Sequence, residues 1–172
     1  TDSTAEICRR YGARVIQRRF DNFANQANFG LDHLTGDWVL SLDADEVVPL
    51  DLAREIQRAL VERGDCVGLT FKRHNHFLGR AMRYGGWRHD VLHLFRRDAG
   101  RFVGQVHYAP QVSGRVAALH GWVEHYPFQR LEQFLERQNR YTSMEAEELF
   151  ALHGPGLCGR VLGQAVAKPL KL

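Results

Sequence analysis

Residues 38–46 read Trp-Val-Leu-Ser-Leu-Asp-Ala-Asp-Glu, an apolar strand pattern that ends in three carboxylates. Because strand residues alternate between two faces, Asp43 and Asp45 are expected to point into one crevice at the carboxyl end of the strand. Two neighbouring carboxylates repel each other unless a cation lies between them, and oxygen ligands suit Mg²⁺ or Mn²⁺ shared with a diphosphate. The stretch therefore predicts a metal and phosphate site. The alternative is that Asp43, Asp45 and Glu46 only cap the loop before a helix expected over 51–62.

The segments around this stretch alternate between helix and strand patterns, with glycines marking short turns. The expected helices lie at 3–11, 22–34 and 51–62, and the expected strands at 13–17, 37–43 and 66–72. Such alternation predicts an α/β layered sheet.

The second half of the chain has a different texture. Residues 73–127 form short strand-like pieces rich in Gly, Arg, His and aromatic residues, the kind of segment in which an α/β enzyme builds an acceptor pocket. From Gln129 the pattern is helical until Gly154, and 157–172 is basic and amphipathic. The last segment suits contact with an anionic lipid surface.

Composition restricts the function classes. The 172 residues are 44% hydrophobic and 25% charged, which is typical of one soluble globular domain. A formal charge of +3, with acids interspersed among the bases, argues against nucleic acid as the main partner. Three scattered cysteines suggest no disulfide framework or zinc site, so a reducing cytoplasmic location is expected.

Four ordered blocks carry a resemblance to a known family. They are Asp2-Ser3-Thr4, residues 23–30 (Phe-Ala-Asn-Gln-Ala-Asn-Phe-Gly), residues 42–46, and the run from Phe77 to Arg97. With these blocks the chain resembles family 2 glycosyltransferases of the GT-A fold. Within them it is similar to the branch that includes lipopolysaccharide-core β-1,4-glucosyltransferases.

The resemblance implies a GT-A-type α/β fold, with a mixed, mostly parallel sheet flanked by helices. Members begin with further strands, so the chain looks clipped at both ends and its sheet is expected to lack the first strands. The implied organisation is a partial GT-A domain over 1–127, with a nucleotide side at 1–48 and an acceptor side at 66–127. A helical amphipathic segment over 128–172 follows.

The implied activity is inverting, metal-dependent transfer of a single hexose, with glucose as the expected sugar. The donor is a nucleotide-diphosphate sugar, and the acceptor is a cell-envelope glycan such as the lipopolysaccharide inner core. Carried over by position, Asp43 and Asp45 bind Mg²⁺ or Mn²⁺. Asp2, Asn25 and Asn28, together with Asp43, contact the donor.

Further contacts to the acceptor or the diphosphate are expected from Trp87, Arg88, Arg96 and His125, with core packing or solvation as the alternative. The family places a general-base Glu after Val-His, but here Val106-His107 is followed by Tyr108. Three residues compete for that role, namely Asp90, His107 and Glu124.

The expected location is the cytoplasm, with peripheral contact to the cytoplasmic face of the inner membrane through 157–172. Two other function classes stay open. One is a non-catalytic nucleotide- or glycan-binding remnant of the same fold, and the other is a nucleotidyltransferase that uses a similar carboxylate pair.

Overall fold

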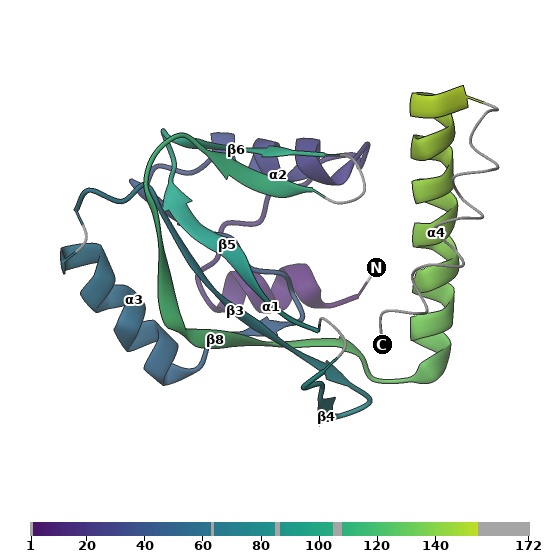
Figure 1. Ribbon diagram of the computed structural model, residues 1–172, viewed down its shortest axis with the longest axis horizontal. Helices are drawn as coiled ribbons and strands as arrows, with labels where there is room; N and C mark the ends of the chain where they lie inside the picture. The colour runs from purple at the N-terminus through teal and green to yellow at the C-terminus, as the bar shows by residue number, and fades with distance from the viewer. Residues whose placement is uncertain (1, 63, 85–86, 105–107, 155–172) are drawn as a thin grey trace.

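The computed structural model describes residues 2–62, 64–84, 87–104 and 108–154 (Figure 1). Its main sheet has the strand order β1-β5-β3-β8-β2, with β4 paired to the outer end of β3. The bounds are β1 Trp38–Leu40, β2 Glu46–Val47, β3 Gly68–Phe77, β4 Arg80–Ala81, β5 Arg88–Arg96 and β8 Val116–Phe128. A separate ribbon pairs β6 (Gly100–Val103) with β7 (Ala109–Val112).

The sheet is mixed. β3 runs parallel to β8, whereas β1 with β5, β5 with β3, and β8 with β2 are antiparallel. The α/β class and the mixed sheet flanked by helices are therefore confirmed. Among the described pairings, only β3 with β8 is parallel. The strand β5 lies between β1 and β3 and is antiparallel to both.

The predicted helices are present with small shifts of their ends, as α1 Thr4–Arg10, α2 Phe23–Asp32, α3 Leu50–Glu62 and α4 Leu131–His153. Asn22 caps α2, because its side-chain oxygen accepts a 2.8 Å hydrogen bond from the Asn25 amide. The strand expected over 13–17 is wrong: no described strand pairs with this segment. A strand requires a hydrogen-bonding neighbour, so apolar alternation alone did not produce one.

Two apolar clusters hold the layers together. On one face of the sheet, Leu52 and Ile56 of α3 pack with Leu69 and Phe71 of β3 and Val123 of β8. The other cluster joins α2 and β6 to the opposite side of the β1–β5 pair, through Ala24, Leu31, Val39, Phe95 and Phe102. All these side chains are buried, which is what fixes the two layers on the sheet.

Two hydrogen bonds to one side chain of α3 fix β8 against this helix. The Glu55 carboxylate accepts hydrogen bonds of 2.8 Å from the amides of both His120 and Gly121. A Cβ on Gly121 would lie 2.9 Å from Leu52 Cδ1 and from the Glu55 carboxylate, so the helix approaches this strand as closely as glycine permits. The course of β8 toward the site is set here.

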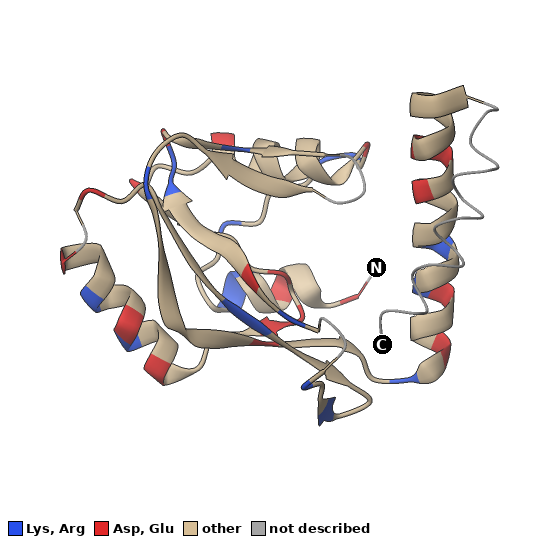
Figure 2. Cartoon of the chain, viewed as in Figure 1, with Lys and Arg blue, Asp and Glu red and all other residues tan. Residues whose placement is uncertain are grey.

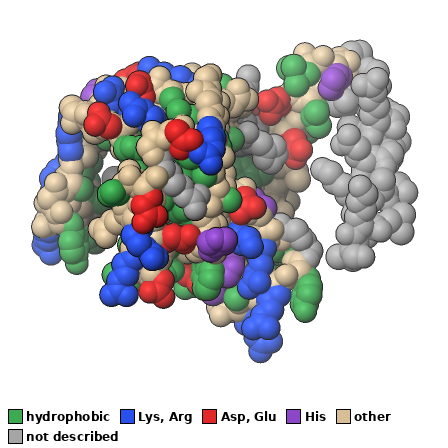
Figure 3. Space-filling view, turned by 60° about the vertical axis from the view of Figure 1, so that its left-hand side comes forward, with side chains coloured by type: hydrophobic (Ala, Val, Ile, Leu, Met, Phe, Trp, Pro, Cys, Tyr) green, Lys and Arg blue, Asp and Glu red, His purple; other side chains and the backbone are tan. Residues whose placement is uncertain are grey.

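The helix α4 stands to the side of the sheet in Figure 1. Phe134 in its first turns packs edge-on against Phe77 and Phe128, with ring centroids 5.2 and 5.1 Å apart. Basic and acidic residues are interspersed along the chain in Figure 2, and their side chains are interspersed on the face shown in Figure 3. No helix within the described ranges is both long enough and apolar enough to span a bilayer.

Candidate functional site

The carboxylate stretch forms a tight loop after β1. The Ser41 amide donates to the His93 carbonyl at 2.8 Å, and His93 Nδ1 donates back to the Ser41 carbonyl at 2.9 Å. Within the loop, the Asp43 amide donates to Glu46 Oε2 at 2.9 Å and the Glu46 amide donates to the Asp43 carbonyl at 3.0 Å. These bonds fix the backbone from which Asp43 and Asp45 project.

Glu46 is the buried member of the three carboxylates. Its side chain is 0% exposed and lies 2.7 Å from Arg73 Nη2, while His93 Nε2 lies 3.8 Å away. Burial lowers the pKa of His93, so Arg73 supplies the positive charge that compensates Glu46. Glu46 thus stabilises the loop from inside, and Asp43 and Asp45 remain at the surface of the site.

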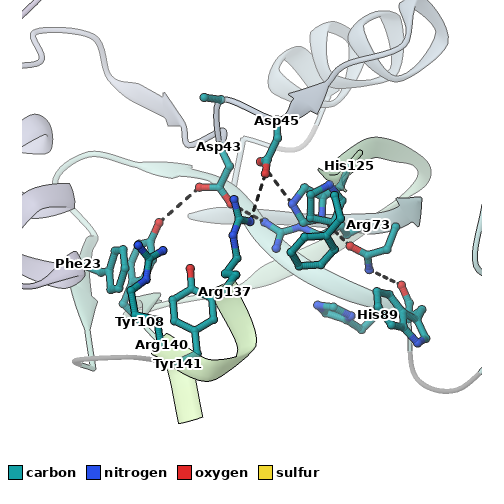
Figure 4. A pocket seen from close by; sticks show the side chains of 15 residues that line it. Phe23, Asp43, Asp45, Arg73, His89, Tyr108, His125, Arg137, Arg140 and Tyr141 are labelled. Carbon is teal, nitrogen blue, oxygen red and sulfur yellow. Dashed lines mark hydrogen bonds and ion pairs between the residues drawn. The ribbon is translucent and has the colours of Figure 1, made fainter. Parts of the chain in front are cut away.

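Asp43 and Asp45 converge with His125 of β8 (Figure 4). One ligand atom from each side chain can be chosen so that all three lie within 4.8 Å of one another. His125 Nε2 is 3.3 Å from Asp45 Oδ1. The structure therefore brings together two residues from the loop and one that follows 80 positions later in the chain.

Asn75 of β3 orients the His125 ring. The Asn75 side-chain amide donates to the Trp87 carbonyl, which turns its oxygen toward His125 Nδ1. With Nδ1 donating to that oxygen, Nε2 is the nitrogen that faces Asp45, and it can bind a cation once its proton is displaced. This is the arrangement in which a metal-binding histidine has its second nitrogen held by a neighbouring group.

The charges at the site suit a cation. The hydrogen bond from His125, and the nearby Arg137, hold the pKa of Asp45 below its usual range despite partial burial, so this carboxylate is ionised at neutral pH. Asp43 lies 3.3 Å from Arg73 Nη2, and Asp45 lies 3.7 Å from Arg137 Nη1. The two carboxylates are hard oxygen donors that fit Mn²⁺ or Mg²⁺, and the imidazole of His125 adds one borderline nitrogen donor.

A cavity of about 780 Å³ opens beside these carboxylates. Arg137, Arg140 and Tyr141 of α4 lie on one side of it, and Phe23 and Tyr108 lie next to Asp43 (Figure 4). This volume is within the range of small-molecule sites. Arginines facing a carboxylate pair provide fixed positive charge for an anionic ligand.

Tyr108 contacts the carboxylate loop from the β6–β7 connection. Its hydroxyl lies 3.4 Å from Asp43 Oδ1, and its ring stacks on Phe23 with a centroid separation of 5.7 Å. Burial, together with the Asp43 charge, raises the pKa of Tyr108 to about 12. The hydroxyl therefore stays protonated at neutral pH and can donate to Asp43.

The geometry separates the candidates for a general base. Glu124 follows Val123 and precedes His125 on β8, so its side chain points to the face opposite the carboxylate loop. There it accepts hydrogen bonds from His76 Nε2 at 2.6 Å and Trp122 Nε1 at 2.7 Å. Burial raises its pKa, but these bonds outweigh that effect and leave it below the usual value. The expectation that Glu124 accepts the proton is not supported by this orientation.

Asp90 lies opposite Lys72 on that same reverse face. It also borders a cavity of about 470 Å³ at the edge of β5 that reaches Asp43, so its candidacy stays open. His107 lies outside the described residues. The structure adds His89, which is opposite Arg73 and lines the main cavity.

The other residues predicted to contact the acceptor or the diphosphate also lie in different parts of the sheet. Trp87 lines the main cavity, whereas Arg88, opposite His74, lines a cavity on the reverse face. Arg96 is a correction: it pairs with Asp98 at the far end of β5, seven residues or roughly 23 Å from His89. Trp87 and Arg96 belong to one continuous block of the sequence, but the extended strand β5 between them places them far apart.

Comparisons with known proteins show which family the chain belongs to. The family model described as "Glycosyl transferase family 2" matches residues 1–122, well over half of the chain. The chain belongs to glycosyl transferase family 2. Among curated proteins, an uncharacterized glycosyltransferase of Rickettsia typhi is 26% identical over 177 residues, covering 87% of this chain and 56% of that protein.

A second relative in the family has a more specific name. The lipopolysaccharide core biosynthesis glycosyltransferase LpsC of Rhizobium meliloti is 25% identical over 161 residues, covering 86% of this chain and 58% of LpsC. The chain thus spans a little over half the length of the curated relatives it matches.

The nucleotide-side residues expected from the glycosyltransferase resemblance have local bonds. Asp2 accepts from the Thr4 amide at 3.1 Å beside α1, and the Asn25 side chain donates to Asp21 at 2.8 Å. Both ends of the Asn28 amide bond the Phe102 backbone, at 2.9 and 3.0 Å, so this residue joins α2 to β6. The donor-binding roles of Asp2, Asn25 and Asn28 stay predictions.

Four residues of this candidate site were not found from the sequence: Arg73, Asn75, Tyr108 as a hydroxyl donor, and Arg137. Arg73 and Asn75 alternate with His74 and His76 on β3, which is a period-2 signal of one shared face. Arg137 and Arg140 are three apart on α4 and so share a side of the helix. Neither signal indicates which face meets the carboxylates.

Proposed function

We propose that the full-length protein transfers a single hexose, glucose, from a nucleotide-diphosphate sugar to a lipopolysaccharide-core glycan with inversion at the anomeric carbon. The observation that carries the proposal is the convergence of Asp43, Asp45 and His125 on a cavity lined by arginines. Family membership supports the transfer of a sugar. The identity of sugar, acceptor and stereochemistry is part of the proposal.

Asp43, Asp45 and His125 would hold a divalent cation, Mn²⁺ or Mg²⁺. Such a cation supplies Lewis-acid stabilisation of the diphosphate leaving group. Asn75 keeps His125 Nε2 available, and the buried Glu46 keeps the loop in place. These residues thus pre-organise the negative donor set before any ligand arrives.

Arg137 would turn from Asp45 toward phosphate oxygens when donor is bound, while Arg73 stays with the buried Glu46. Arg137 now lies 3.7 Å from Asp45, and Arg140 lines the same cavity. A guanidinium group can donate two parallel hydrogen bonds to a phosphate. The diphosphate would then lie between the carboxylate loop and α4.

Inversion follows from a single displacement in which an acceptor hydroxyl attacks the anomeric carbon and the diphosphate leaves from the opposite side. A side chain near that hydroxyl must accept its proton. Asp90 and His107 stay candidates for this step, and His89 joins them because it lines the cavity.

The acceptor assignment rests on the name of the Rhizobium meliloti relative, which refers to lipopolysaccharide core biosynthesis. We include in the proposal a cytoplasmic location and contact of residues 157–172 with anionic lipid at the inner membrane. These residues lie outside the described part of the chain. Salt-sensitive binding of the full-length protein to anionic but not neutral vesicles tests this part.

The test is transfer by the purified full-length protein from UDP-glucose to oligosaccharide released from lipopolysaccharide by mild acid. We expect product only with added Mn²⁺ or Mg²⁺, and NMR of the new linkage to show the anomeric configuration opposite to that of the donor. Retained configuration overturns the inverting assignment, and full activity in a chelator overturns the metal assignment.

A non-catalytic binding remnant is the second candidate, favoured by the tyrosine that follows Val106-His107. It predicts Mn²⁺-dependent binding of UDP-glucose without turnover. Calorimetric titration beside the transfer assay separates the two functions.

A further inference from the structure

We propose that the reverse face of the β3–β8 pair is a second glycan subsite, which binds a sugar unit of the acceptor away from the reacting end. The proposal rests on the proposed function for the source of the glycan. The site itself is argued from side chains that take no part in the carboxylate cluster.

The subsite is formed by residues that alternate with those of the first site. On β3, Lys72, His74 and His76 point away from the face of Arg73 and Asn75, and on β8 Trp122 and Glu124 point away from the face of His125. A cavity of about 650 Å³ lies over these side chains. Strand geometry thus gives the sheet a hollow on its reverse face.

An exposed tryptophan is the centre of this hollow. Trp122 is 42% exposed although its indole stacks on the His74 ring, with centroids 4.6 Å apart and an interplanar angle of 17°. Burial and the nearby Arg88 lower the pKa of His74, which favours a neutral stacking partner. The apolar face of a pyranose ring packs on such an aromatic surface.

The carboxylate of Glu124 holds the aromatic side chains of this hollow in place. Glu124 accepts from Trp122 Nε1 at 2.7 Å and from His76 Nε2 at 2.6 Å, and His76 stacks on Tyr126 with centroids 4.4 Å apart. Trp122 and Tyr126 are therefore fixed on the same side of β8, both partly exposed. A pre-organised aromatic surface loses little side-chain entropy when a ligand binds.

The rim of the hollow is polar, as a sugar ligand requires. Lys72 and Arg88 offer donors, and Asp90 offers acceptors, all bordering the same cavity. These two cations and the carboxylates of Asp90 and Glu124 balance, so the site suits the hydroxyls of a neutral sugar better than a free anion. Planar polar groups around an aromatic face give directional hydrogen bonds to hydroxyls.

His89 of β5 borders both faces of the sheet. Among the described residues β1 pairs with β5 at residues 94–96, and His89, outside this pairing, lines both the main cavity and the reverse one. A glycan with its reacting end near Asp43 can therefore continue past His89 and the edge of β5 to Trp122. This path is the physical link between the subsite and the transfer reaction.

The first experiment measures KM and kcat of the full-length protein for two acceptors, the core oligosaccharide and a methyl glycoside of its terminal sugar. For Trp122→Ala we expect the oligosaccharide KM to rise about tenfold, with kcat unchanged and the methyl glycoside KM unchanged. Trp122→Phe retains an aromatic face and restores most of the affinity. Tyr11→Ala, which removes an 88% exposed aromatic at the end of α1, is the matched control and changes neither KM.

The second experiment titrates the same oligosaccharide, without donor, into wild type and Trp122→Ala and follows backbone amide NMR shifts. Wild-type shifts in β3, β8 and the adjoining residues 88–90 of β5, lost in the variant, support the subsite even if no transfer is found, in which case only the proposed function fails. Equal binding by both proteins, or an equal rise of both KM values in Trp122→Ala, overturns the subsite. Circular dichroism of each variant verifies the fold.

Discussion

The two faces of β3 show how one strand can serve two different tasks. Arg73 and Asn75 face the carboxylate loop, where charges converge and are partly withdrawn from water. His74 and His76, displaced by one residue each, face the reverse hollow, where aromatic rings stack and remain partly exposed. The difference teaches that electrostatic and stacking chemistry can be built back to back, with the pleat as the separator.

The comparison predicts that changes on the loop face alter turnover, whereas changes on the reverse face alter only the recognition of a long acceptor. Each variant below tests that division, beginning with the largest expected effect.

Asp45→Asn removes one charge from the donor set while its shape is kept. We expect kcat to fall about 1,000-fold, because a group that stabilises the leaving group is typically worth that much. Asp98→Asn, at the distant end of β5, is the control and keeps full activity. Wild-type turnover by Asp45→Asn would place the reactive centre elsewhere.

Asn75→Ala leaves His125 present but frees its ring. The expected result is a 10- to 100-fold weaker affinity for Mn²⁺, about the usual effect of removing a group that orients a metal ligand. Electron paramagnetic resonance of bound Mn²⁺ measures it. His76→Ala, the next residue of β3 but on the reverse face, should bind Mn²⁺ as wild type does, and a loss there would contradict the separation of faces.

Tyr108→Phe deletes the hydroxyl that donates to Asp43. One such hydrogen bond is worth about 1 kcal/mol, so kcat/KM should fall about fivefold. Because the pKa of Tyr108 is raised to about 12, the hydroxyl keeps its proton throughout the neutral range and loses it only at strongly alkaline pH. The ratio of wild type to variant should therefore be flat from pH 6 to about 9, and a ratio that titrates in this range speaks against the assignment.

Glu124→Gln has the smallest expected effect, and it tests most directly whether the two faces of the sheet have separate roles. With the methyl glycoside acceptor we expect kcat within about twofold of wild type, since the carboxylate points away from the cavity. A general base contributes at least about 100-fold, so a loss of that size would assign the base to Glu124. The oligosaccharide KM should rise, because glutamine has one acceptor oxygen and cannot accept from both Trp122 and His76 as the carboxylate does.

The sequence was sufficient for the parts of this site that are local. Asp43 and Asp45 follow a strand, the helix before them has a cap at Asn22, and the helices on both sides have apolar faces, so the loop and most elements were predictable. His125 was expected only by resemblance, and the structure brings it to the pair. A local sequence pattern does not indicate which strand lies next to which in the sheet.

The features that the sequence did not predict also depend on which segments lie next to each other in the fold. Arg96 stands in a motif block with Trp87, but the strand between them carries it to the other end of the sheet. Asn28 shares a helix side with Asn25, yet its amide meets the backbone of Phe102, which is 74 residues away. Residues 13–17 have the pattern of a strand and lack a partner among the described strands. Each outcome depends on a long-range contact.

The parallel pairing of β3 with β8 carries one more consequence. His125 lies opposite Asn75, and Glu124 lies opposite His74. One inserted residue ahead of Trp122 would shift the strand by one position and place the Glu124 carboxylate where the imidazole now lies. The donor set would change from two carboxylates and a nitrogen ligand to three carboxylates, although no residue of the loop is substituted. The metal preference of the proposed site is therefore open to change by a single codon insertion far from the acidic motif.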